Sequence, residues 1–285
     1  MAHPVRFGIR CSQHHRDWAE IKEWFQAADD WGLESAWVFD HMIPLSDPRD
    51  NPNLEGWTLL AGLAEATQNI DIGPMVTGIT YRNPSMLLKE VTTVDHISNG
   101  RALLGVGAAW FQGEHEMFGI DFPRDGQRVS MLEEVIQIFK MLQSQDRSTF
   151  EGEYYQVKDA IFEPKPVRNP MPLVIGGSKP RMLGIIARHA DWWDNNFSDP
   201  EDYKARVDRI NSVCAEIGRD PSEIRRSTTR GESYLVDHNE DEIVEDLQSL
   251  RDLGMTDFLF HVPKDMNVLR NFVENTVPAL RERWS

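Results

Sequence analysis

The chain has 285 residues, of which 40% are hydrophobic and 27% are charged, the balance of an ordinary globular protein. Its formal net charge is −16, and so negative a field disfavours nucleic acid and anionic membrane surfaces as partners. Its two cysteines, Cys11 and Cys214, lie far apart in no metal-ligand pattern, which indicates a reducing compartment and argues against a zinc site.

The amino-terminal sequence MAHPVRFGIR lacks the apolar run of a signal peptide. No stretch approaches the 18 consecutive apolar residues that a membrane-spanning helix needs. We therefore expect a cytoplasmic protein without a membrane partner.

Segments with β-strand character alternate with amphipathic segments along the chain. Strands are expected at residues 5–10, 35–39, 70–77, 102–107, 172–176, 191–195, 225–229 and 258–262. Helices are expected at residues 17–31, 57–67, 84–97, 127–142, 179–189, 200–217, 241–253 and 266–284. Repeated βα units imply a parallel sheet with right-handed crossovers, and eight of them favour a closed (β/α)8 TIM barrel, which leaves no exposed edge strand.

One segment, at about residues 148–170, interrupts this alternation between the fourth and fifth βα units. It is typical of a short hairpin at 149–157 followed by a proline-rich loop. We interpret it as an insertion within a single barrel domain that comprises residues 1–285. Among the helix starts, Ser198 and Asn239 are predicted to be N-caps.

An acid and an imidazole, Asp40 and His41, follow the second predicted strand. In a barrel, functional side chains gather at the carboxyl ends of the strands. A neighbouring carboxylate can fix the tautomer of an imidazole, so the pair is a candidate for acid–base catalysis. In the alternative interpretation Asp40 caps the loop and His41 lies on the surface.

Glycine and proline are concentrated at the ends of the third and fourth strands. The third, Gly73-Pro-Met-Val-Thr-Gly78, predicts a bulge, which serves either a close ligand or barrel curvature. The fourth ends in Gly105-Val-Gly-Ala-Ala-Trp110, which lacks the third glycine and the acidic residue of a dinucleotide fingerprint, so a Rossmann interpretation is rejected. Its small residues leave room for a flat ring beside Trp110, or serve tight packing at the barrel mouth.

The fifth strand runs through Gly176-Gly177-Ser178-Lys179 directly into a helix. Such a turn exposes backbone N–H groups at a helix start, where an anion is favoured, so it is a candidate phosphate site or else a plain tight turn. Other polar residues at strand ends, His14 and Asn195 among them, have no metal-ligand spacing.

Four segments resemble one family in order and spacing: Glu34 to His41, Gly73 to Pro84, Leu104 to Trp110, and Ile175 to Gly177 together with Ala190 to Trp193. They resemble the luciferase-like monooxygenase superfamily, closest to its branch of oxidoreductases that use the deazaflavin coenzyme F420. The resemblance extends over residues 5–260, including Phe150 to Tyr155. It implies a TIM barrel, usually a homodimer, with a tricyclic ring over the third-strand bulge and a non-prolyl cis peptide at Met75–Val76.

The resemblance also implies roles for particular residues. Gly176 and Gly177 match the family's phosphate-binding turn, and His41 matches a histidine that acts in acid–base chemistry in its sugar-phosphate dehydrogenases. Those enzymes use a glutamate just after the fourth strand. This sequence has Trp110 there, and its nearest acid is Glu114, which argues against sugar-phosphate substrates.

The sequence therefore predicts hydride transfer between F420 and an unidentified organic substrate, with His41 as the proton donor or acceptor and Asp40 as its orienting group. The predicted cofactor contacts are Met75, Val76, Thr77, Gly107, Ala108, Ala109, Trp110, Gly176, Gly177 and Ser178. The predicted substrate-pocket residues are His14, Trp57 and Asn195. The alternatives are an FMN-dependent monooxygenase supplied by a flavin reductase, and a flavin carrier without turnover.

Overall fold

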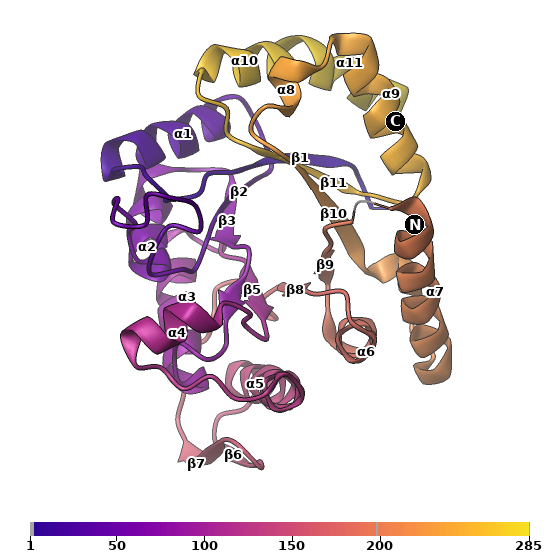
Figure 1. The fold of residues 1–285 in the computed structure, drawn as a ribbon. Helices are drawn as coiled ribbons and strands as arrows, with labels where there is room; N and C mark the ends of the chain where they lie inside the picture. Colours follow the sequence, from indigo (N-terminus) through magenta and orange to yellow (C-terminus); the bar gives the residue numbers. More distant parts are fainter. Residues whose placement is uncertain (1–2, 198, 285) are drawn as a thin grey trace.

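The computed structural model describes residues 3–197 and 199–284, and its centre is a parallel sheet rolled into a barrel (Figure 1). The strands lie in the order β3-β2-β1-β11-β10-β9-β8-β5-β4. They are β1 (Arg6–Arg10), β2 (Ser35–Val38), β3 (Asp71–Pro74), β4 (Thr77–Gly78), β5 (Leu104–Gly107), β8 (Leu173–Gly176), β9 (Trp192–Asp194), β10 (Arg225–Arg230) and β11 (Asp257–His261). The predicted (β/α)8 barrel is confirmed.

The third predicted strand is divided into β3 and β4, and the peptide bond Met75–Val76 between the two halves is cis, as the family resemblance implied. β3 pairs with β2, whereas β4 pairs with β5. The amide of Leu103 donates to the carbonyl of Ile72 at 2.8 Å, so β3 also reaches the chain that leads into β5. The irregular strand is thus the place where the barrel wall closes.

Helices surround the barrel and cover its outer face (Figure 1). The α-helices are α1 (Trp18–Asp30), α2 (Gly56–Ala66), α3 (Pro84–Ile97), α4 (Gln112–Phe118), α5 (Asp125–Ser144), α6 (Pro180–His189), α7 (Pro200–Ile217), α8 (Tyr234–Asp237), α9 (Glu240–Asp252), α10 (Met266–Asn271) and α11 (Val277–Arg283). A 3-10 turn, η1 (Pro221–Glu223), precedes β10, and a π-helical turn, η2 (Phe272–Thr276), separates α10 from α11. The single closing helix predicted at 266–284 is therefore wrong in detail.

Local capping determines where several helices begin. Asn239 and Glu242 form a reciprocal capping box at the start of α9, which confirms the predicted cap at Asn239. The predicted cap Ser198 lies outside the described residues. At the start of α7 the carboxylate of Asp199 accepts the amide of Glu201 at 3.0 Å.

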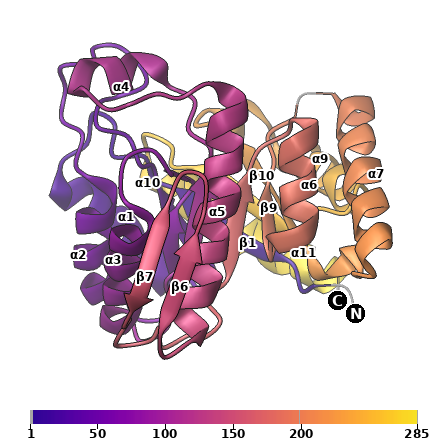
Figure 2. The ribbon, with the colours of Figure 1, turned by 90° about the horizontal axis from the view of Figure 1, so that it is seen from below.

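The insertion forms the antiparallel hairpin β6 (Ser148–Glu151) and β7 (Gln156–Ala160), between the fourth and fifth barrel units as predicted. It lies outside the barrel against α5 (Figure 2). Glu134 of α5 fixes the hairpin turn, because its carboxylate accepts the amides of Glu153, Tyr154 and Tyr155 at 2.7 to 3.0 Å.

Six side chains fill the barrel interior below the strand ends: Trp37, Met75, Leu103, Val174, Trp192 and Leu259. The rings of Trp37 and Trp192 meet edge to face at 5.1 Å, a favoured aromatic geometry. This apolar layer is the base on which the site at the strand ends rests.

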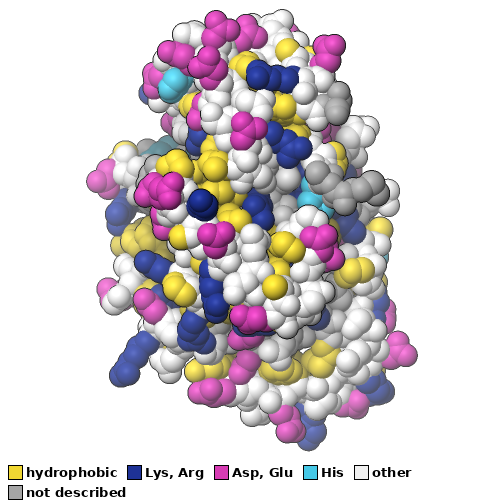
Figure 3. Space-filling model, turned by 90° about the vertical axis from the view of Figure 1, so that its right-hand side faces the viewer, with side chains coloured by type: hydrophobic (Ala, Val, Ile, Leu, Met, Phe, Trp, Pro, Cys, Tyr) yellow, Lys and Arg dark blue, Asp and Glu magenta, His cyan; other side chains and the backbone are white. Residues whose placement is uncertain are grey.

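Acidic and basic side chains are both scattered over the face shown in Figure 3. Among the described residues, no helix is long and apolar enough to cross a membrane. Within the same part of the chain, no group of three or more His, Cys, Asp or Glu residues is placed to hold a metal ion.

Candidate active site

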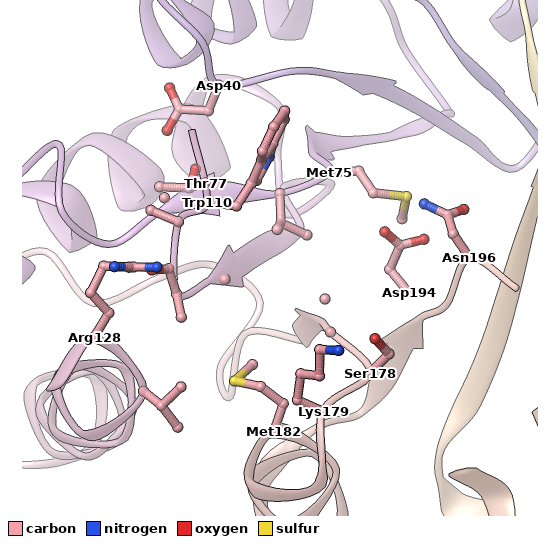
Figure 4. A pocket seen from close by; sticks show the side chains of 18 of the residues that line it. Asp40, Met75, Thr77, Trp110, Arg128, Ser178, Lys179, Met182, Asp194 and Asn196 are labelled. Carbon is pink, nitrogen blue, oxygen red and sulfur yellow. The ribbon is translucent and has the colours of Figure 1, made fainter. Parts of the chain in front are cut away.

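A cavity of about 900 Å³ opens at the carboxyl ends of the barrel strands. Three segments from different βα units line it: Met75 to Gly78, Gly107 to Trp110, and Gly176 to Met182. In Figure 4, Met75, Asp194 and Asn196 lie at one side of the cavity, and Ser178, Lys179 and Met182 lie near one another at the start of α6. A volume near the upper end of the ordinary range for ligand pockets suits a cofactor together with a small substrate.

The bulge at Met75 and Val76 requires glycine on the neighbouring strand. A Cβ atom on Gly105 would lie 2.0 Å from the carbonyl oxygen of Pro74, and one on Gly107 would lie 2.8 Å from Cγ2 of Val76. Gly105 and Gly107 therefore accommodate the bulged backbone, and Gly107 also lines the cavity. Ala108 and Ala109 lie beyond it on the cavity wall.

A buried charge pair lies under the bulge. Arg10 donates to the carbonyl oxygen of Met75 at 2.9 Å and to the hydroxyl of Thr229 at 3.1 Å. Burial lowers the pKa of Arg10, and the field of Asp194 opposes that effect. Burial likewise raises the pKa of Asp194, against the field of Arg10 and a hydrogen bond from Ser227. Arg10 thus holds the bulged carbonyl in place from inside the barrel.

The glycine turn between β8 and α6 has a backbone that favours glycine. Gly177 has φ of +141°, and a Cβ atom there would lie 3.1 Å from Cε of Met182. The indole N–H of Trp193 donates to the carbonyl oxygen of Gly177 at 2.8 Å and fixes the turn. The amides of the first turn of α6 have no acceptor within the helix, so an anion between Ser178 and Lys179 would meet both these donors and the positive end of the helix dipole.

His41 is bonded to Glu114, a residue that the sequence analysis did not assign to the site. Nδ1 of His41 lies 2.9 Å from Oε2 of Glu114, whose side chain is fully buried, while the ring lines the cavity. Oε2 also accepts the hydroxyl of Tyr81, and Oε1 accepts the amides of Met42 and Ile43 at 2.6 and 3.1 Å. Burial opposes ionisation of Glu114, but the hydrogen bonds from His41 and Tyr81 outweigh it and lower the pKa of Glu114. An ionised Glu114 makes Nδ1 a donor and leaves Nε2 of a neutral His41 as a base.

Asp40 has a different partner from the one expected. Its two carboxylate oxygens pair with both terminal nitrogens of Arg82, at 2.7 and 3.0 Å. Burial raises the pKa of Asp40, and Arg82 counteracts this. The expectation that Asp40 orients His41 is therefore corrected: Glu114 makes the hydrogen bond to the imidazole, and Asp40, which lines the cavity wall, forms a bidentate ion pair with Arg82.

Trp110 lies at the cavity mouth and is 65% exposed. The residue before it, Ala109, has φ of +60°, and this left-handed turn directs the chain away from the strand. The indole meets the ring of His41 nearly edge-on at 5.8 Å and stacks on Phe111 at 5.3 Å. Trp110 therefore forms an apolar wall next to the imidazole.

The three predicted substrate-pocket residues have different surroundings. His14 lines a second, neighbouring cavity. Trp57 is buried beneath the site, where its indole N–H donates to the hydroxyl of Thr77 at 2.9 Å. The side-chain oxygen of Asn195 accepts from Arg206 at 3.0 Å, and its neighbour Asn196 lines the main cavity instead.

A parallel barrel with an irregular third strand, a glycine turn at a helix start and a buried acid–base pair at the strand ends defines a TIM-barrel enzyme. The chain belongs to the luciferase-like monooxygenase family, whose model matches residues 3–282.

Comparisons with individual proteins agree with this membership. The chain is 26% identical to an F420-dependent glucose-6-phosphate dehydrogenase of Microbacterium testaceum. The alignment is 340 positions long and covers 100% of both proteins. It is 28% identical to a phthiodiolone/phenolphthiodiolone dimycocerosates ketoreductase of Mycobacterium bovis, over 79% of this chain and 63% of that protein. Its fold is similar to that of an F420-dependent secondary alcohol dehydrogenase solved with an F420–acetone adduct, with a TM-score of 0.87, 20% identity and coverage of 98% of this chain and 99% of the other.

Proposed function

We propose that the chain is an oxidoreductase that transfers a hydride between coenzyme F420 and an organic substrate. One observation carries the proposal: His41, bonded through Nδ1 to the buried Glu114, lines the same cavity as the third-strand bulge and the glycine turn. The names of the dehydrogenases and of the ketoreductase to which the chain is similar support hydride transfer. The substrates that those names give are not assigned to this chain.

The residues of the cavity fit a planar, phosphate-bearing cofactor. The ring would rest on the bulge at Met75 to Thr77, beside Gly107 to Trp110, with the phosphate at Gly176 to Ser178. The turn supports this assignment because the left-handed backbone at Gly177 leads directly into the start of α6, where backbone N–H groups favour an anion. When bound, F420 accepts or supplies the hydride at its ring.

The protein's own contribution is proton transfer and orientation. For oxidation of an alcohol, Nε2 of neutral His41 takes the hydroxyl proton while the substrate loses a hydride; for reduction, Nε2 returns the proton to the new alkoxide. Glu114 keeps the ring oriented and stabilises its protonated form. Trp110 and the bulge line the cavity beside the imidazole.

Titration of the full chain with F420 and with FMN tests the cofactor assignment. We expect F420 to bind in the micromolar range, on the order of −8 kcal/mol, and FMN to bind at least about tenfold more weakly. Fluorescence of the deazaflavin and quenching of the protein's tryptophan fluorescence report the binding. Tight binding of FMN alone would sink the F420 assignment.

The description of the family favours one rival, a monooxygenase that uses reduced FMN and oxygen and takes its flavin from a reductase partner. Formation of an oxygenated product from a candidate substrate, dependent on the enzyme and on reduced FMN, separates this rival from a dehydrogenase, because free reduced FMN consumes oxygen by itself. Turnover of F420 without oxygen consumption supports the dehydrogenase.

The Gly177→Ala variant tests the phosphate turn. A β-carbon at φ +141° is strained and contacts Met182, so we expect stability to fall by about 1–3 kcal/mol and F420 to bind about tenfold more weakly. Urea unfolding and cofactor titration measure the two effects. Gly184→Ala in α6 is the matched control, since its new methyl would meet only the flexible tip of Arg188 at 3.4 Å. Equal F420 affinities in both variants would argue against phosphate at Gly177.

We also propose, on the family resemblance, that the chain acts as a homodimer in the cytoplasm. A chain of 32.8 kDa gives a dimer of twice that mass, 65.6 kDa. Light scattering of the purified protein distinguishes this mass from that of a monomer.

A further inference from the structure

A second cavity of about 530 Å³ lies beside the first. Phe39 and Leu45 line both cavities, so the two are neighbours across these side chains. The ring of His14, in the second cavity, is 6.5 Å from that of His41, in the first. A substrate that reacts at His41 therefore has a place beside it for the part of the molecule that does not react.

The formal charges around this second cavity balance. Arg16 and Lys264 provide two cations, and Glu20 and Glu232 provide two carboxylates, with histidine counted as neutral. Arg16 is paired with both acids, at 2.8 Å from Glu20 and 3.5 Å from Glu232. A guanidinium neutralised in this way attracts an added anion only weakly.

Two histidines that line this cavity, His14 and His261, are neutral at physiological pH. Burial, aided by the field of neighbouring groups such as Arg16, lowers the pKa of His14 to about 4. Burial, aided by Arg10, lowers the pKa of His261 to about 4 as well. Both imidazoles stack on the ring of Phe39, with centroid distances of 5.1 Å for His14 and 6.0 Å for His261.

His14 has a polar atom that lacks a partner. Its side chain is buried, with 9% of the residue exposed, and Nε2 makes no hydrogen bond within the part of the chain that the structure describes. Buried polar atoms in native proteins are nearly always satisfied, so an orphan on a cavity-lining residue indicates a ligand group as its partner.

We propose that the second cavity holds the substrate, that the substrate is an uncharged hydroxyl- or carbonyl-bearing compound, and that Nε2 of His14 forms a hydrogen bond with one of its oxygens. This inference rests on the proposed function, which places the reacting carbon at His41. A phosphorylated substrate meets no net positive charge in this cavity, because two carboxylates balance its two cations. A neutral imidazole, in contrast, can donate to a carbonyl or accept from a hydroxyl without charge.

Binding of two matched probes to the full chain without added cofactor tests the inference, so that a wrong cofactor assignment leaves the readout intact. The probes are cyclohexanol and cyclohexyl phosphate, which differ in charge at one position. We expect cyclohexanol to shift the imidazole NMR signals of His14 with a dissociation constant on the order of millimolar, and cyclohexyl phosphate to bind at least about fivefold more weakly. Tighter binding of the phosphate to the unaltered chain would overturn the proposal.

Three variants, compared by calorimetry, separate hydrogen bonding from charge. His14→Ala weakens binding of cyclohexanol at least about fivefold, His14→Gln restores part of the loss through its amide, and His238→Ala, at an exposed residue, changes nothing. Glu232→Gln releases Arg16 from one acid, so we expect cyclohexyl phosphate to bind about fivefold more tightly and cyclohexanol to stay within twofold. An unchanged affinity for cyclohexanol in His14→Ala overturns the role of His14.

Discussion

Replacing His41 by alanine lowers kcat for F420-linked hydride transfer by about 100- to 10,000-fold, the usual contribution of a positioned general acid–base group. The imidazole lines the cavity and its Nδ1 is already engaged by Glu114, so Nε2 is the atom available to a substrate. The bulge at Met75 and the turn at Gly177 do not depend on this side chain. We therefore expect F420 to bind to His41→Ala within about threefold of its normal affinity.

Single-turnover kinetics with F420 already bound measure the loss at the chemical step. His96→Ala is a suitable control, because this histidine lies in the last turn of α3 and bonds only to the carbonyl of Lys165 in the described part of the chain. If His41→Ala retains full turnover while binding F420, proton transfer at His41 is wrong and the substrate is activated by another group. Loss of F420 binding together with turnover would make His41 a cofactor contact.

The barrel could be predicted from the sequence because each βα unit carries its own signals. Asn239 begins α9 and Pro84 begins α3, both through chemistry confined to a few residues. The division of the third strand was indicated by Gly73, Pro74 and Gly78, which suit an irregular strand. The cis bond at Met75–Val76 came from the family resemblance and from no local pattern.

The partner of His41 could not be predicted, because Glu114 is 73 positions away along the chain. No helix or strand was predicted between residues 107 and 127, where the structure contains the seven-residue helix α4. One signal was present: Gly119, with φ of +67°, ends α4 in the manner typical of a helix C-terminus. A short helix that ends there would have placed Glu114 and His115 next to each other on its buried side.

Asp40 shows that adjacency in sequence does not predict which side chains interact. Neighbours in sequence need not share a partner, and Arg82, at the end of the third βα loop, attracts the carboxylate instead. Arg82 also pairs with Glu55, at the start of α2, and with Glu90, within α3. The ion pair therefore belongs to a network that joins these two helices to the segment after β2. Such long-range pairing depends on the closed barrel, and no pattern in the local sequence predicts it.

Replacing Glu114 by glutamine lowers kcat by about 100-fold or more, because the acid holds His41 in the orientation and tautomer that leave Nε2 free. The new amide presents N–H groups to a site whose partners, Tyr81 and the amides of Met42 and Ile43, are all donors. We expect stability at neutral pH to fall by roughly 1–3 kcal/mol as one buried donor loses its acceptor. Glu116→Gln, on the exposed side of the same helix, leaves both quantities unchanged.

The pH dependence distinguishes a positioning role from simple damage to the fold. The folded-state pKa of Glu114 is below its ordinary value of 4.5, so the carboxylate contributes stability that is complete above that value and is lost as the pH falls through the folded pKa. The glutamine variant lacks this acid-dependent loss. Its imidazolium has also lost the counter-charge, so the acidic limb of its rate profile for alcohol oxidation moves to lower pH. A rate profile that keeps its shape while kcat falls would mean that Glu114 supports the loop around Met42 and has no influence on the proton at His41.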